Sequence, residues 1–170
     1  MEGTQGYHFF WSGHFSQWHR SDLTYEGVNF QCAEQAMMHA KAMLFGDQTI
    51  AGQILDATDP GKQKALGRQV KGFDDTVWDT AKETIVHDIS LAKYVQNKGL
   101  RRKLFQTHPA LMVEASPMDT VWGIGLDEAE ARETPPELWP GQNLLGKILT
   151  RVRVALADMH SEEFSAIAPK

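Results

Sequence analysis

The sequence predicts a single domain in which several helices accompany a few short strands. Its 170 residues, 42% of them apolar, are enough to bury one sizeable core. Apolar residues recur at helical spacing over several long segments, whereas a few short runs are rich in aromatic and β-branched residues, as strands are. The chain has no internal repeat and no low-complexity tract, so nothing indicates a repeat architecture.

Four short strands are expected, two of them joined in a hairpin. Glu26-Gly27 separates those two by only two residues, which is a hairpin signal. In chain order the expected strands are His8–Trp11, Leu23–Tyr25, Val28–Phe30 and Ala110–Ala115. The segment 12–16, which follows the first strand, is expected to be a loop.

Six helices are expected, and most carry a signal at one end. Asp59 before Pro60 and the pair Asp74-Asp75 are N-terminal caps, and Gly46 is a C-terminal cap. The first helix contains Glu34 and ends near Gly46. The next three are Thr49–Leu55, Pro60–Gly72 and Thr76–Gln96. A short helix then ends at about Gln106, and the last helix follows Gly141-Gln142-Asn143 and runs to about Leu156.

The two longest helices have a predicted core face. On Thr76–Gln96 the core face consists of Trp78, Ile85, Ile89 and Ala92. On the last helix it consists of Leu145, Ile148, Leu149 and Val152. Asn143 is the expected cap of the last helix, whose N-terminus is a candidate anion site. Leu126–Pro140 is expected to be a surface loop. We expect a domain over residues 1–158 and a poorly ordered C-terminal tail over residues 159–170.

Composition limits the function classes. The formal net charge of -5 argues against an extensive nucleic-acid surface, although a local basic cluster can still hold a few phosphates. Cys32 is the only cysteine, so the sequence has no intramolecular disulfide and no cysteine cluster for zinc. With no signal peptide and no apolar run near 18 residues, we expect a cytoplasmic protein without a membrane partner.

A carboxylate and an amine lie seven positions apart on the first helix. At about 100° per residue, Glu34 and Lys41 point almost the same way, roughly 10 Å apart along the axis. Met37 and Met38 occupy the intervening turn. In a partly apolar pocket this pair would suit acid/base work by Glu34 and nucleophilic work by Lys41. The alternative is an amphipathic helix whose charges are solvated.

The third helix carries two cations on one face. Lys64 and Arg68 are four positions apart, and Gly67 beside them lets another chain or a ligand come close. The sequence therefore indicates a phosphate site, with a solvated basic stripe as the alternative.

A second informative stretch, Ser116–Gly125, follows the last strand. Proline, Asp119, Trp122 and two glycines make a rigid loop in which the backbone can approach a ligand while the indole offers a flat face. A purely structural loop has the same composition, so both interpretations stay open.

These blocks, taken in order, resemble the NADAR or YbiA-like family over residues 9–154. They are Phe15-Ser16, Tyr25–Lys41, Lys64–Arg68, Trp78, Glu114–Pro117, Asp119, Trp122–Gly125 and Gly141–Gly146. The sequence departs from the family pattern at Cys32, where a serine is expected, at Met37-Met38, where aromatic residues are more usual, and in the length of the 126–140 segment.

The resemblance implies a mostly helical α+β single domain with a small β-sheet, and an N-glycosidase that removes ribose-type sugars from base amino groups. One branch acts on phosphoribosylamino intermediates of riboflavin biosynthesis, and the other removes ADP-ribose from guanine. The expected partner is therefore ADP-ribosylated guanine, in a nucleotide or in DNA, or a phosphoribosylamino base. No metal or other cofactor is expected.

The resemblance also assigns site residues. Glu34 would protonate the leaving amine, Lys41 would trap the opened sugar as an imine, and Asp119 would hold ribose hydroxyls or act as a second carboxylate. The expected substrate-binding residues are Phe15, Ser16, Lys64, Gly67, Arg68, Trp78, Ser116, Trp122, Gly123 and Asn143. A non-catalytic ADP-ribose or nucleotide-binding module and an interaction protein are the alternatives, and the intact pair of Glu34 and Lys41 speaks against both.

Overall fold

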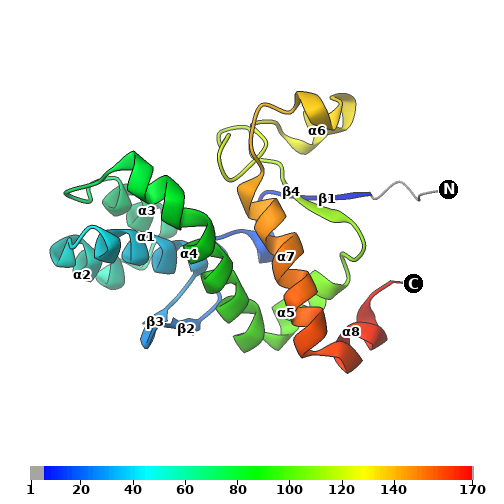
Figure 1. Cartoon of the computed structure of the whole chain (residues 1–170), viewed down its shortest axis with the longest axis horizontal. Helices are drawn as coiled ribbons and strands as arrows, with labels where there is room; N and C mark the ends of the chain where they lie inside the picture. Colours follow the sequence, from blue (N-terminus) through cyan, green and yellow to red (C-terminus); the bar gives the residue numbers. More distant parts are fainter. Residues whose placement is uncertain (1–5, 170) are drawn as a thin grey trace. The chain divides into compact units, whose positions relative to one another are not determined.

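The computed structural model describes residues 6–169 and is mostly helical with two small β-sheets, which confirms the expected α+β class (Figure 1). Residues 1–5 of the predicted domain and Lys170 of the predicted tail lie outside the described residues. The chain groups into two compact units. Unit 1 joins the N-terminal segment that ends at Ser16 to the segment that begins at Lys98, and unit 2 is Gln17–Asn97.

Unit 2 is a β-hairpin followed by four helices. Its elements are β2 (Leu23–Tyr25), β3 (Val28–Phe30), α1 (Ala33–Leu44), α2 (Gln48–Asp56), α3 (Pro60–Gly67) and α4 (Asp75–Gln96). The predicted hairpin is confirmed. Glu26 and Gly27 both have positive φ, which a two-residue turn needs if its twist is to match that of the strands. The side chains that cap the last three helices belong to Asp47, Asp59 and Asp74.

Helix α3 ends at Gly67, so the predicted extension to Gly72 is wrong. In a continuing helix, the amide of Lys71 would donate to the carbonyl of Gly67. It donates instead to the Asp47 carboxylate, 2.9 Å away, while the same carboxylate also accepts from the amide of Ile50. The α2 cap thus draws the chain out of helical geometry.

The buried face of α4 differs from the predicted one. Its buried residues are Val86, Ile89, Ser90, Lys93 and Tyr94, whereas Trp78, Ile85 and Ala92 are only partly buried. Only Ile89 is predicted correctly. The buried face of α4 includes Ser90 and Lys93. A prediction from apolar spacing leaves such polar residues out, and it therefore selected a neighbouring face of the helix.

Unit 1 is built around a parallel pair of strands. Its elements are β1 (Tyr7–Phe10), the 3₁₀-helix η1 (Gly13–Phe15), α5 (Lys98–Phe105), β4 (Leu111–Glu114), α6 (Glu128–Glu133), the 3₁₀-helix η2 (Pro136–Leu138), α7 (Leu144–Met159) and α8 (Ser161–Ile167). Strand β1 pairs with β4, with Tyr7 opposite Leu111, and α7 lies against β4 (Figure 1). The four predicted core residues of α7 are all buried.

Two predictions for unit 1 are wrong. The segment 126–140 is not simply a loop, because Asp127 and Glu130 form a reciprocal capping box that starts α6, and Ala131 is buried in a cluster with Val113 and Ile124. The tail is not disordered over its described part, since α8 forms there. Phe164 on α8 packs edge-on against Phe105 at 5.1 Å.

Among residues 6–169, no helix combines the length and the hydropathy needed to cross a membrane.

Gly67 is expected to be essential for packing α3 on α1. A Cβ atom at this position would collide with Sδ of Met38 and would lie 3.0 Å from its Cγ. Gly67→Ala should therefore lower the free energy of unfolding by about 1–3 kcal/mol, because overpacking forces a well-packed side chain to move. Urea denaturation measures this loss.

Gly52→Ala is the matched control. Gly52 lies inside α2, and a Cβ atom added there would meet no packed neighbour within 4 Å. Alanine should be neutral there or stabilise by up to about 1 kcal/mol. Adding Met38→Ala to Gly67→Ala should recover part of the loss due to crowding, and equal effects at the two glycines would contradict the packing role.

Candidate active site

Glu34 lies in the first turn of α1 and is nearly buried, with 4% of its surface exposed. A negative charge is favoured in this turn because the helix dipole places partial positive charge there. The backbone amide of Glu34 donates to the carbonyl of Gln17, 2.9 Å away, which fixes the start of the helix. The carboxylate is therefore held on an ordered turn, as acid/base chemistry requires.

Two glutamines fix this turn against the rest of unit 2. Gln35 accepts from the amide of Gln31, and its Nε2 lies 3.0 Å from the carbonyl of Ile54 at the end of α2. Gln63 on α3 donates to the carbonyl of Ala57, and its Oε1 accepts from the thiol of Cys32 at 3.3 Å. These side chains satisfy carbonyls at the C-terminal end of α2 and just beyond it.

Cys32, the position that departs from the family pattern, is the N-cap residue of α1, but its side chain makes no capping hydrogen bond. Burial raises the pKa of the Cys32 thiol, so the neutral thiol is favoured. The thiol serves as a buried donor to Gln63.

The amine of Lys41 lies against two aromatic rings. Its Nζ is 4.4 Å from the ring centroid of Phe73 and 5.7 Å from that of Trp78. Phe73 is itself held edge-on by Phe45 at 5.3 Å. An ammonium over a ring face gains a modest electrostatic attraction, while the rings remove part of its water.

Burial lowers the pKa of Lys41, because a partly apolar environment disfavours the ammonium. Asp75 raises this pKa, Arg68 lowers it, and Glu34 raises it, each by a smaller amount. The charges of α1, α3 and the first turn of α4 thus all act on one amine. A lowered pKa leaves a larger share of neutral amine near pH 7, as a nucleophile needs.

The predicted phosphate residues of α3 have different environments. Lys64 is half-buried, whereas Arg68 is exposed at the end of the helix and close enough to influence Lys41. Gly67 lies directly against the side chain of Met38, so its small size serves helix packing. Met37 is also buried, and its sulfur accepts from Nε2 of Gln17 at 3.5 Å.

The loop after β4 in unit 1 is ordered by Asp119. Its Oδ1 accepts from the amides of Val121 and Trp122, each at 2.8 Å. Gly123 fits closely there, because a Cβ would lie 2.9 Å from the carbonyl oxygen of Glu114. Part of what the sequence indicates for this loop is therefore structural.

The predicted anion site at the start of α7 is wrong. The amides of residues 141–145 donate to the carbonyls of residues 120–124, which leaves these donors occupied. Asn143 has positive φ and does not cap the helix with its side chain. It reaches β4 instead, where it accepts from the amide of Glu114 and donates to the carbonyl of Met112.

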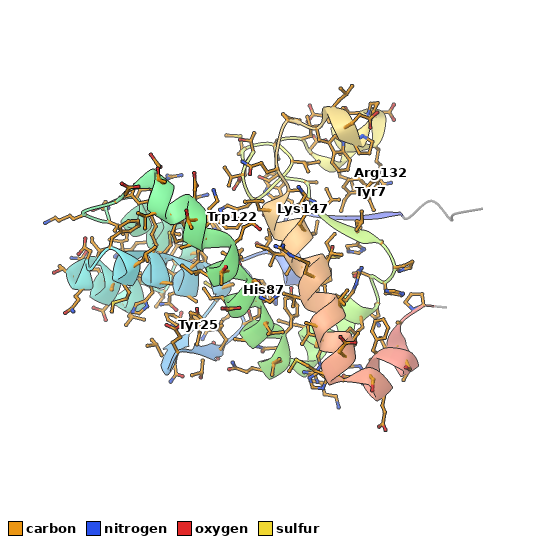
Figure 2. All side chains as sticks on the ribbon, in the orientation of Figure 1. Tyr7, Tyr25, His87, Trp122, Arg132 and Lys147 are labelled. Atoms are coloured by element: carbon orange, nitrogen blue, oxygen red, sulfur yellow. The ribbon has the colours of Figure 1, made fainter. Side chains whose placement is uncertain are left out.

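Four other predicted residues lie in unit 1. Phe15 packs edge-on against His8 at 5.5 Å and Phe10 at 5.8 Å, and the amide of Ser16 donates to the carbonyl of Gly13. Ser116 is buried, and Trp122 is half-buried (Figure 2). The roles of these residues in substrate binding stay predictions.

The structure thus brings Glu34, Lys41, Arg68 and Trp78 into one electrostatic and aromatic environment within unit 2. Sequence analysis missed Phe73, Asp75 and the two glutamines. Sequence spacing could not identify Phe73 and Asp75 as neighbours of Lys41, because they come close to it only when α4 packs on α1. Among residues 6–169, no cluster of three or more His, Cys, Asp or Glu side chains is arranged to hold a metal.

Comparison with known families decides the relationship. The model of the NADAR domain matches residues 9–157. The chain belongs to the NADAR family.

Relatives and one solved structure agree with this membership. An N-glycosidase of Acanthamoeba polyphaga mimivirus is 41% identical over 144 residues, which are 82% of this chain and 85% of the relative. Protein irg-1 of Caenorhabditis elegans is 42% identical over 131 residues, 76% of this chain and 62% of that protein. The NMR structure of Escherichia coli YbiA has the same fold, with a TM-score of 0.76 at 24% identity, over 93% of this chain and 89% of YbiA.

In this NADAR chain, Asp119 is expected to order its loop through an oxygen acceptor. Asp119→Ala should lower the free energy of unfolding by about 1–3 kcal/mol, because two partly buried amides lose their partner. Asp119→Asn keeps an oxygen at the same position and should stay close to wild type in thermal denaturation. An asparagine variant as unstable as the alanine variant would show that charge, and not the acceptor, orders the loop.

Proposed function

We propose that this NADAR chain is an N-glycosidase that hydrolyses the bond between a ribose C1 and the exocyclic amino group of a base. We further propose ADP-ribosylated guanine, in a nucleotide or in DNA, as its substrate. The observation that carries the proposal is the buried Glu34 on the same helix face as Lys41, whose amine lies over Phe73 and Trp78. Relatives named as N-glycosidases support the reaction class.

Glu34 is suited to protonate the leaving group. A base amine is a poor leaving group, and cleavage develops positive character at the sugar C1. A carboxyl group on an ordered, nearly water-free helical turn supplies a proton to the nitrogen and, once ionised, stabilises the positive carbon.

Lys41 is suited to attack C1. Because the nitrogen is exocyclic, the ribose ring opens to an imine between C1 and the base nitrogen. The neutral Lys41 amine adds to C1, the base leaves as a free amine, and a lysine imine remains. Water then hydrolyses that imine, releasing the sugar and regenerating the amine, so the net change is addition of one water across the glycosidic bond.

The surroundings of Lys41 fit an anionic, aromatic substrate. Arg68 supplies an exposed guanidinium near the amine, which suits a phosphate, and Lys64 adds a half-buried cation on the same helix. Trp78 and the partly exposed Phe73 offer ring faces to a base.

Glu34→Gln is expected to lower turnover of ADP-ribosylated guanine by about 10²–10⁴-fold, since glutamine keeps the shape but has no transferable proton. Released ADP-ribose is followed by mass spectrometry, with a phosphoribosylamino-pyrimidine as a parallel substrate. Glu137→Gln, at an exposed position of η2, is the control and should retain full activity.

The outcomes separate the candidates. Release of phosphoribose alone would move the chain to the riboflavin-type branch. Tight binding of ADP-ribose without turnover of either substrate would make it a non-catalytic reader, and activity of Glu34→Gln within about tenfold of wild type would remove Glu34 from the acid/base role.

Lys41 is expected to be trapped covalently. Borohydride added during turnover should reduce the imine and add the mass of the sugar to the peptide that contains Lys41. Lys41→Arg should be inactive, because a guanidinium forms no such imine. Lys71→Arg, at an exposed site in unit 2, should be trapped and active like wild type.

Phe73→Ala tests the role of burial. Hydration of the amine should raise the pKa of Lys41, so kcat at saturating substrate should fall near pH 7 and approach wild type as pH rises through that pKa, whereas the lost ring face should raise KM at every pH. An active Lys41→Arg enzyme without an adduct would contradict the covalent route and leave direct water attack.

A further inference from the structure

Unit 1 contains a hollow of about 510 Å³ that none of the predicted catalytic residues lines. Its walls come from β1, β4, η2 with the residues after it, and α7. Tyr7 and Trp139 form an aromatic side, Met112 and Leu111 line the floor, and Lys147 with Arg151 form the α7 side. Figure 2 labels Tyr7 and Lys147. This volume lies within the range of small-molecule sites.

The aromatic side is held in place before any ligand arrives. Trp139 donates its indole N–H to the carbonyl of Thr134 at 3.0 Å, and its ring meets Tyr7 edge-on at 5.2 Å and Phe9 at 6.0 Å. Tyr7 keeps 40% of its surface exposed. A fixed aromatic wall with accessible surface recognises planar rings with little loss of side-chain freedom.

The charged side chains on the α7 side of the hollow are both positive. Lys147 and Arg151 are exposed and one turn apart on α7, a spacing at which like charges repel. Among the described residues that line the hollow, none is acidic, although the chain carries a net charge of -5. An anion in the hollow would therefore lie beside positive side chains and meet no acidic one among the described lining residues.

Helix α7 is anchored so that these cations keep their position relative to the strand. Thr150 accepts from the amide of Met112 at 3.1 Å, and Asn143 bonds to both Met112 and Glu114. These hydrogen bonds therefore hold the helix that carries the cations against the strand that forms the apolar floor.

We propose that this hollow binds a planar aromatic anion of about the size of a mononucleotide. Its ring lies against Tyr7 and Trp139, and its carboxylate or phosphate lies beside Lys147 and Arg151. This binding site goes beyond the proposed glycosidase activity. Asn143, a predicted substrate-binding residue, lines the hollow but bonds to β4 through its side chain, and none of the four side chains proposed to contact the ligand is assigned to the glycosidase.

The test is a residue-resolved NMR titration of the full chain. Guanosine 5′-monophosphate and 4-hydroxybenzoate should each shift the amide signals of Leu111, Trp139 and Lys147, and the tighter of the two identifies a nucleotide or a free aromatic acid as the source. Guanosine, which lacks the anion, and inorganic phosphate, which lacks the ring, should bind at least tenfold more weakly.

Variants distinguish binding in the hollow from a general effect of the protein's surface charge. Lys147→Glu and Tyr7→Ala should each weaken binding at least tenfold, and Lys103→Glu, the same charge change on an exposed position of α5, should leave it unchanged. Equal weakening by Lys103→Glu, binding of guanosine as tight as that of its monophosphate, or shifts confined to other residues would each overturn the proposal. Glu34→Gln should bind as wild type, which separates this result from the glycosidase test.

Discussion

The side-chain amide of Gln35 is the constraint on which unit 2 depends. It is 2% exposed, and its Nε2 lies within 3.2 Å of the carbonyls of Ile54, Leu55 and Ala57 while its Oε1 accepts from Gln31. Gln63 also donates to the carbonyl of Ala57, but without Gln35 the carbonyls at the end of α2 would lose a buried donor, which is costly. One amide therefore joins the hairpin exit, the first turn of α1 and the end of α2.

This arrangement determines where Glu34 points. Gln35 faces α2, and the preceding residue is rotated by about 100° around the helix axis. Seven positions later, Lys41 returns to nearly the direction of Glu34, and the close contact of Gly67 with Met38 holds α3 against the same helix. The acid and the amine thus share a face because they are seven positions apart, and Met38 between them lets α3 pack beside that same face.

The sequence predicted the elements that local chemistry dictates. The Glu26-Gly27 turn, the aspartate caps and the core face of α7 follow from backbone preferences and apolar spacing, and all formed as expected. Three of the errors and omissions have a common cause, since each depends on a partner distant in sequence, whereas α6 was missed although its capping box is local. Asp47 captures the amide of Lys71, Asn143 bonds to β4, and Phe73 reaches Lys41 only through the packing of α4 on α1.

The choice of aromatic partners for Lys41 is consistent with the role we propose for it. A carboxylate in direct contact would stabilise the ammonium, raise its pKa and suppress the neutral form that attacks carbon. Phe73 and Trp78 remove water but return only a modest attraction, so desolvation remains the dominant influence and the pKa falls. Asp75 and Glu34 partly oppose this decrease in the pKa of Lys41, and Arg68 reinforces it.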